Sequence, residues 1–269
     1  TAEDIPPVLE LYAENPSSPT APSATGTNAV AIGSQAEASG SGAISFGIDA
    51  TATTTNSIAI GNYTDAITQT GAVAIGFSAQ SVGLNAMALG RSYASGTDSF
   101  AAAIANNTSS YGATGTNSVA IGFRAKANGG HGFAVGYQNI ASGNYSVALG
   151  RNSTSAGAQG FSAGYLSEAA AENSTALGFR SKTKVQGQFA VTSGYFVSAG
   201  DTQTSIYTLR SDTTDATPEA LTTNNSTPST TNQIILPNNS AYAFHGTIVA
   251  REQASAGTDC AAWKIEGLI

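Results

Sequence analysis

The sequence predicts an all-β protein: a parallel β-roll of about twelve stacked coils, followed by a small antiparallel β domain. A short phrase, Asn-Ser-Val-Ala-Ile-Gly in its most regular copy at residues 117–122, recurs about every 14 residues, and such a period indicates a repeat architecture. Large and small residues alternate within each copy, which is the period of a β-strand. Most copies end on glycine, which supplies a backbone turn that a side chain would resist.

The repeat array extends over residues 28–192. Two degenerate copies end at Ala103 and Thr192 in place of glycine. The other copies end on the predicted turn glycines, which are Gly33, Gly47, Gly61, Gly76, Gly90, Gly122, Gly136, Gly150, Gly164 and Gly178.

Each repeat is expected to contain two strands. The large residues of the first strand include Val30, Ile32, Ile58, Ile60, Val73, Ile75, Val119, Ile121, Val147 and Leu149, with Ala or Ser between them. A second phrase after most glycines alternates small and polar residues, which predicts a strand with a small inner face and a wetted outer face. Two strands and two turns make one coil, so twelve coils stacked at ~4.7 Å would form a rod roughly 55 Å long.

The first strand is apolar or small on both faces, and only one face can line the interior. A large side chain contributes ~1.5–3 kcal/mol when it is buried, and a continuous Val/Ile stripe is not tolerated on a soluble monomer. The sequence therefore predicts an obligate oligomer in which the Val/Ile set faces partner chains and the Ala/Ser set faces the roll interior. The reverse assignment is the alternative.

The repeated phrase closely resembles the head repeats of YadA-like trimeric adhesins over residues 28–192. This resemblance implies a left-handed parallel β-roll that assembles as a homotrimer around a three-fold axis. The sequence departs from the pattern at Ala103 and Thr192, and at the Phe/Ala pairs 100/102 and 161/163. A five-residue excess within residues 105–116 is expected to bulge outward as a loop.

The two flanks lack the 14-residue period. Residues 1–27 are rich in proline and are expected to form an extended linker with one short strand at residues 7–12. Residues 193–269 are expected to form the antiparallel domain, with strands at residues 205–210, 233–237, 241–251 and 261–269. This last part resembles C-terminal segments of bacteriophage fibre and other virion proteins, notably at residues 235–237 and 262–267. Because the sequence stops on a strand, further residues are expected to follow in the native protein.

Composition disfavours several classes of function. The net charge is −7 and no basic stripe is present, so nucleic-acid binding is disfavoured. No window of 18 apolar residues predicts a transmembrane helix, so no membrane insertion is expected. The single cysteine, Cys260, cannot form an intrachain disulfide and is expected to be buried.

No constellation of residues indicates catalysis. Acidic residues of the array are scattered singly, without the paired carboxylates of a glycosidase, and no Cys/His spacing fits a metal site. His131 and His245 are isolated, so no catalytic residue, cofactor or metal is expected. The aromatic residues that follow the repeat glycines could stack on sugars, or could pack between neighbouring chains at the edge of the roll; they are Phe77, Phe123, Tyr137, Tyr165 and Phe179.

The sequence favours a structural trimeric fibre protein of a bacteriophage virion, such as a tail fibre, which presents a host-surface contact. Its partners would be two further copies of the chain, other virion proteins, and a glycan or protein receptor on the host cell. The alternative is a head fragment of a bacterial trimeric autotransporter adhesin at the cell surface, although that family's coiled-coil stalk and membrane anchor are not found in this stretch. A tail-spike enzyme that degrades surface polysaccharide is the third and weakest hypothesis.

Overall fold

The computed structural model describes residues 20–105, 110–236, 238, 240–253 and 259–269. The chain divides into two compact units, residues 1–233 and residues 234–269. All regular structure within the described ranges is β, and none of it is a helix that could cross a membrane. The strand expected at residues 7–12 and part of the expected loop, residues 106–109, lie outside the described residues.

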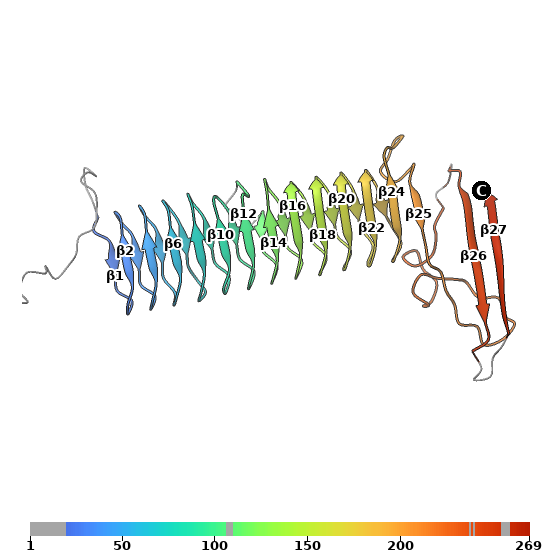
Figure 1. The fold of residues 1–269 in the computed structure, drawn as a ribbon, viewed down its shortest axis with the longest axis horizontal. Helices are drawn as coiled ribbons and strands as arrows, with labels where there is room; N and C mark the ends of the chain where they lie inside the picture. The colour runs from blue at the N-terminus through green and yellow to red at the C-terminus, as the bar shows by residue number, and fades with distance from the viewer. Residues whose placement is uncertain (1–19, 106–109, 237, 239, 254–258) are drawn as a thin grey trace, which may run out of the picture. The chain divides into compact units, whose positions relative to one another are not determined.

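The first unit is a roll made of two parallel sheets, and each coil gives one strand to each sheet (Figure 1). The large sheet contains β2 (Val30–Ile32), β4 (Ile44–Phe46), β6 (Ile58–Ile60), β8 (Val73–Ile75), β10 (Met87–Leu89), β12 (Phe100–Ala102), β14 (Val119–Ile121), β16 (Phe133–Tyr137), β18 (Val147–Arg151), β20 (Phe161–Tyr165), β22 (Thr175–Phe179), β24 (Phe189–Thr192) and β25 (Thr204–Ile206).

The small sheet consists of two-residue strands. It contains β1 (Ser23–Ala24), β3 (Glu37–Ala38), β5 (Thr51–Ala52), β7 (Asp65–Ala66), β9 (Gln80–Ser81), β11 (Tyr93–Ala94), β13 (Gly112–Ala113), β15 (Lys126–Ala127), β17 (Ile140–Ala141), β19 (Thr154–Ser155), β21 (Glu168–Ala169) and β23 (Lys182–Thr183). The all-β solenoid expected from the repeats is confirmed, and it begins at Ser23, five residues before the expected boundary.

The coils stay in register although their lengths differ. Val119 pairs with Phe133 at the usual spacing of 14 residues. Ile58 pairs with Val73 and Met87 pairs with Phe100, so these coils are one residue longer and one residue shorter. Phe100 pairs with Val119 across the five-residue excess. The additional residues therefore fall between strands in the sequence, and the strands of successive coils remain aligned.

The interior of the roll is filled by small side chains. The second residue of each strand from β4 to β24 points inward, and Ala59, Ala74, Ala120 and Ala148 are fully buried, as are Ala52 and its equivalents in the small sheet. Two facing sheets of alanine and serine leave a narrow interior, and the larger buried side chains Ile104 and Asn139 lie outside the strands. The small set therefore faces inward, which is the expected orientation rather than the reverse.

Each coil turns at residues with positive φ. Asn117 and Asn152 adopt the left-handed region at φ 53° and 54°, which asparagine enters more readily than most residues. The ten repeat glycines all have positive φ, and Gly136 is at 120°. A Cβ atom at Gly136 would lie 2.1 Å from the carbonyl oxygen of Gly150 in the next coil, so this position admits no side chain.

Residues that follow the roll differ from the expected domain. Strand β25 pairs antiparallel with β24, so it completes the large sheet and is shorter than the strand expected at residues 205–210. The strand expected at residues 233–237 is wrong for residues 233–236, because no described strand pairs with this exposed apolar run, and residue 237 lies outside the described residues. Residues 193–233 belong to the same unit as the roll.

The second unit contains one antiparallel hairpin, β26 (Ala243–Arg251) and β27 (Cys260–Leu268). Strand alternation gathers Phe244, Ile248, Trp263 and Ile265 on one face, opposite a polar face. The expected antiparallel sheet is confirmed. The buried thiol is wrong: Cys260 is exposed, because a two-stranded sheet offers no second layer to cover it.

Candidate interaction surface

The outer face of the large sheet carries two columns of large side chains, formed by the first and the third residue of each of its strands from β2 to β24, on either side of the inward-pointing second residue. The first column consists of Val30, Ile44, Ile58, Val73, Met87, Phe100, Val119, Phe133, Val147, Phe161, Thr175 and Phe189. The second column consists of Ile32, Phe46, Ile60, Ile75, Leu89, Ala102, Ile121, Val135, Leu149, Ala163, Leu177 and Val191. All ten residues predicted to contact partner chains lie in these columns.

Both columns are open to solvent in the single chain. Phe46 is 50 % exposed, Val30 46 %, Val191 40 % and Phe133 39 %. No residue of either column is charged. The ladder pairs each column member with its counterpart in the next coil, so the side chains form a continuous apolar face. A face of this extent marks an interaction surface on a soluble protein.

A ladder of aromatic and arginine side chains follows the second column in the later coils. Phe123 stacks on Tyr137 with ring centroids 5.1 Å apart, and Tyr165 stacks on Phe179 at 5.3 Å. The guanidinium group of Arg151 lies between these pairs, 5.4 Å from the ring of Tyr137 and 5.2 Å from that of Tyr165. Neighbouring coils therefore cover the ring faces within one chain. Stacking on a sugar needs a free ring face, so these stacks within one chain argue against that role, while packing between neighbouring chains stays a prediction.

The remaining predicted aromatic residue, Phe77, lies apart from this ladder. It meets Tyr63 edge to face with centroids 6.0 Å apart, and it is 58 % exposed. His131 stacks on Tyr145 at 4.5 Å in a separate ladder at the other turn of the coil. These contacts join consecutive coils and so stabilise their stacking.

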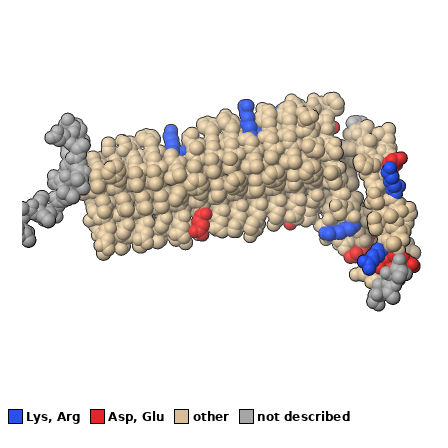
Figure 2. All heavy atoms as spheres, in the orientation of Figure 1, with Lys and Arg blue, Asp and Glu red and all other residues tan. Residues whose placement is uncertain are grey.

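The outer face of the small sheet is polar. Lys182 and Glu168 form an ion pair of 2.7 Å between adjacent strands, and Gln80 donates a hydrogen bond of 3.1 Å to Asp65. Burial raises the pKa of Asp65 above its usual value, and the negative charge of Asp49 adds to this, while the bond from Gln80 opposes it. Figure 2 shows charged groups as isolated patches along the visible side of the roll.

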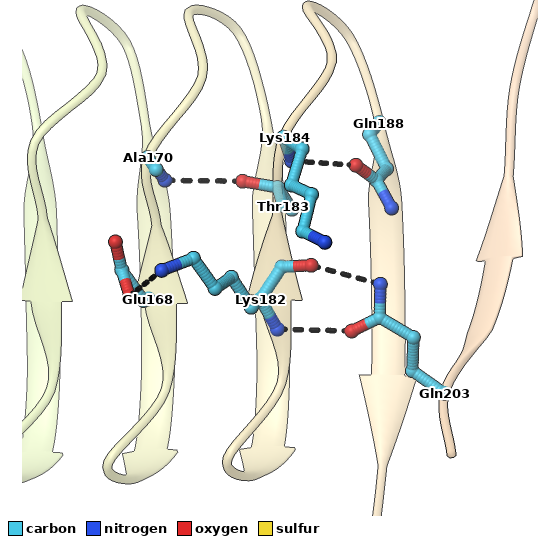
Figure 3. A network of polar contacts seen from close by, with 7 residues as sticks. All are labelled: Glu168, Ala170, Lys182, Thr183, Lys184, Gln188 and Gln203. Atoms are coloured by element: carbon cyan, nitrogen blue, oxygen red, sulfur yellow. Dashed lines mark hydrogen bonds and ion pairs between the residues drawn. The ribbon is translucent and has the colours of Figure 1, made fainter. Parts of the chain in front are cut away.

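Side chains close the C-terminal end of the roll (Figure 3). The amide of Gln203 accepts a hydrogen bond of 2.9 Å from the Lys182 backbone N–H and donates one of 2.8 Å to the Lys182 carbonyl. It thus takes the place of a further strand beside β23. Gln188 accepts hydrogen bonds from the backbone N–H groups of Lys184 and Val185. With β25 beside β24, both sheet edges are covered at this end, which prevents uncontrolled pairing. The sequence analysis did not identify this closure.

Within the described ranges, no group of three or more His, Cys, Asp and Glu side chains could hold a metal ion. Asp201 accepts hydrogen bonds from the N–H groups of Phe196, Val197 and Ser198, and these bonds hold the pKa of its carboxyl below the usual value. This arrangement orders a loop whose Phe196 and Val197 side chains are exposed.

The comparisons with known proteins address the repeat array. The family model of the YadA head domain repeat matches residues 24–47, 38–64, 68–92, 113–139, 131–153 and 155–181. These matches leave out residues 93–112, which belong to the coil with the five-residue excess. They also do not reach residues 182–269, so the resemblance of the C-terminal part to phage proteins stays a prediction. A search of curated proteins found no match to the chain. The matched segments between residues 24 and 181 are therefore similar to YadA head domain repeats.

Proposed function

We propose that the chain is the rod-forming part of a trimeric, adhesin-like fibre, in which three copies bring their large sheets together. The observation that carries this proposal is the uncharged outer face of the large sheet, formed by the first and second columns. The family of the repeats supports a trimeric assembly. The YadA head repeat is a structural fold, and the proposal involves no reaction.

The large side chains have no alternative cover within the roll. The interior is occupied by alanines such as Ala74 and Ala120, which are already fully buried. Val73, Ile75, Val119 and Ile121 therefore cannot turn inward, and burial requires other chains. Each such side chain gains ~1.5–3 kcal/mol when it leaves water, so the free energy of association accumulates with every coil.

The fibre would serve as an external appendage of a bacteriophage virion that contacts a glycan or protein receptor on the host cell and is held by other virion proteins. The resemblance of residues 235–237 and 262–267 to virion proteins favours this location. An adhesin on a bacterial cell surface is the second candidate, and the repeats support it equally. In both cases, three copies of a weak receptor site would strengthen attachment through avidity.

The assembly is tested by sedimentation equilibrium on the purified chain. We expect a species of three times the chain mass of 26.9 kDa. Replacement of both Val119 and Ile121 by Asp should abolish the trimer, because the burial of an unpaired charge costs much free energy. Lys126→Asp on the outer face of the small sheet is the matched control and should leave the trimer intact. A folded, stable single chain would contradict the proposal.

The location needs a separate measurement. Antibodies against the folded roll, applied to purified phage particles and to intact bacteria of the source, should label one of the two in electron micrographs. Label on the virion supports the phage fibre, and label on the cell surface supports the adhesin. If neither is labelled although the protein is expressed, both locations are wrong.

A further inference from the structure

Side-chain size in the first and second columns is correlated coil by coil. Where the first column holds phenylalanine, the second holds only Ala or Val: the pairs are Phe100/Ala102, Phe133/Val135, Phe161/Ala163 and Phe189/Val191. Where the first column holds another residue, the second holds Ile, Leu or Phe: the pairs are Val30/Ile32, Ile44/Phe46, Ile58/Ile60, Val73/Ile75, Met87/Leu89, Val119/Ile121, Val147/Leu149 and Thr175/Leu177. The rule holds in every coil.

When a large side chain in one column is matched by a small one in the other, the two side chains usually share a close-packed interior. Phe plus Ala has about as many side-chain carbons as Val plus Ile, eight against seven, and cores accept substitutions best when total volume is kept. A face in open water imposes no such limit, because a larger side chain simply extends further into solvent. The two columns therefore share a confined volume in each coil.

The single chain does not provide that confinement. Residues two apart on one strand have Cα atoms ~6.6 Å apart, and Phe133 and Phe189 remain 39 % and 37 % exposed. Within the described part of the chain, both rings therefore remain open to solvent on the outer face of the large sheet. The confinement must come from whatever covers the face.

We infer that the first column of each copy packs against the second column of the next copy at the same coil level, so that each first-column phenylalanine fills the space left by Ala or Val of its neighbour. This inference rests on the proposed trimer and specifies its contacts. The size of the second-column residue changes irregularly from coil to coil. A partner must vary in the same order along all coils to complement it, and another copy in the same register does so by construction.

Disulfide trapping tests the contact directly. The variant Phe100→Cys with Ala102→Cys, on a Cys260→Ser background, is oxidised and separated on a non-reducing gel. The two cysteines of one strand have parallel Cβ atoms ~6.6 Å apart, beyond the ~3.5–4.5 Å that a disulfide requires, so any bond joins two chains. We expect a covalent trimer from the pair and no dimer from either cysteine alone.

The matched control is Thr51→Cys with Thr53→Cys, an equally spaced pair at β5 of the small sheet, which should remain unlinked. Dimers from Phe100→Cys alone would mean that first columns meet each other, and would overturn the inference. An unlinked pair in a protein that sediments as a trimer would also overturn it while leaving the trimer intact. A monomer in sedimentation would instead reject the proposed function.

The size relation between the columns can also be tested by converting a Val/Ile layer into a Phe/Ala layer. Val119→Phe overfills its layer, and we expect the melting temperature to fall by about 5–10 °C. Adding Ile121→Ala converts this layer to the Phe/Ala type and should restore most of the loss, although Ile121→Ala alone is also destabilising. If the two shifts add instead of cancelling, the columns do not share a volume and the inference is wrong.

Discussion

Gly136 offers the most direct test of how the coils stack. At φ 120° the backbone lies outside the regions that an alanine adopts without strain, which costs about 1–3 kcal/mol. The new Cβ would also stand 2.1 Å from the Gly150 carbonyl oxygen, which is a backbone atom that cannot rotate away. Relief requires the coils to separate locally, with the loss of one or two ladder hydrogen bonds at about 1 kcal/mol each.

We therefore expect Gly136→Ala to lower the free energy of unfolding by about 3–5 kcal/mol per chain, or the melting temperature by about 10–15 °C. Gly90 is the matched control, since it occupies the same place in its repeat. Its φ is 69° and an added Cβ meets nothing within 4 Å. Gly90→Ala thus incurs only left-handed strain of about 1 kcal/mol, a shift of about 2–4 °C.

Thermal unfolding followed by circular dichroism compares the two variants under identical conditions. The reasoning is refuted if both shift the melting temperature equally, because the carbonyl of the next coil would then not limit this position. A neutral effect of Gly136→Ala would further mean that the turn does not have the left-handed geometry described above.

Three further predictions follow from other parts of the roll. Ala120→Leu places a large side chain in the fully buried alanine interior, so limited proteolysis should cleave the variant within the repeats while the native roll resists. Gln203→Ala uncovers the edge of β23, so the Lys182 amide, which donates to Gln203, should exchange its hydrogen faster while amides in β15 are unchanged. The raised pKa of Asp65 means that the folded state binds the proton more tightly, so stability falls as pH rises from 3.8 through the folded pKa. Asp65→Asn should therefore raise the melting temperature at pH 7 and leave it unchanged near pH 3, and a gain at both values would exclude ionisation as the cause.

The sequence was sufficient to predict the roll because the residue pattern of each repeat determines the local structure of that repeat. The Val-Ala-Ile pattern at residues 119–121 specifies a strand and its buried face, and Gly122 specifies where the strand ends. Neighbouring copies then specify the register, since a one-residue slip would place the large side chains in a space that only alanine fits. The two outward columns were identified by the same argument.

Parts of the chain without repetition were predicted less well. The apolar run at residues 234–236 has the composition of a strand, but a strand requires a neighbour, and composition does not reveal one. The closure by Gln203 joins residues 21 positions apart through a side-chain amide, which no local pattern signals. The start at Ser23 was missed because the first coil begins in its small-sheet strand, whose phrase is less distinctive than that of the large sheet.

The pairing of Phe100 with Val119 shows that the register of the solenoid depends on its strands and not on the number of residues between them. A turn can accept an insertion, and the next coil still docks where it would have docked without it. Each turn is therefore a potential insertion site. Foreign peptides inserted at the same turn of successive coils would be displayed ~4.7 Å apart along the roll. Diversity could accumulate at these sites during evolution, or be introduced by design, without any change to the scaffold that supports them.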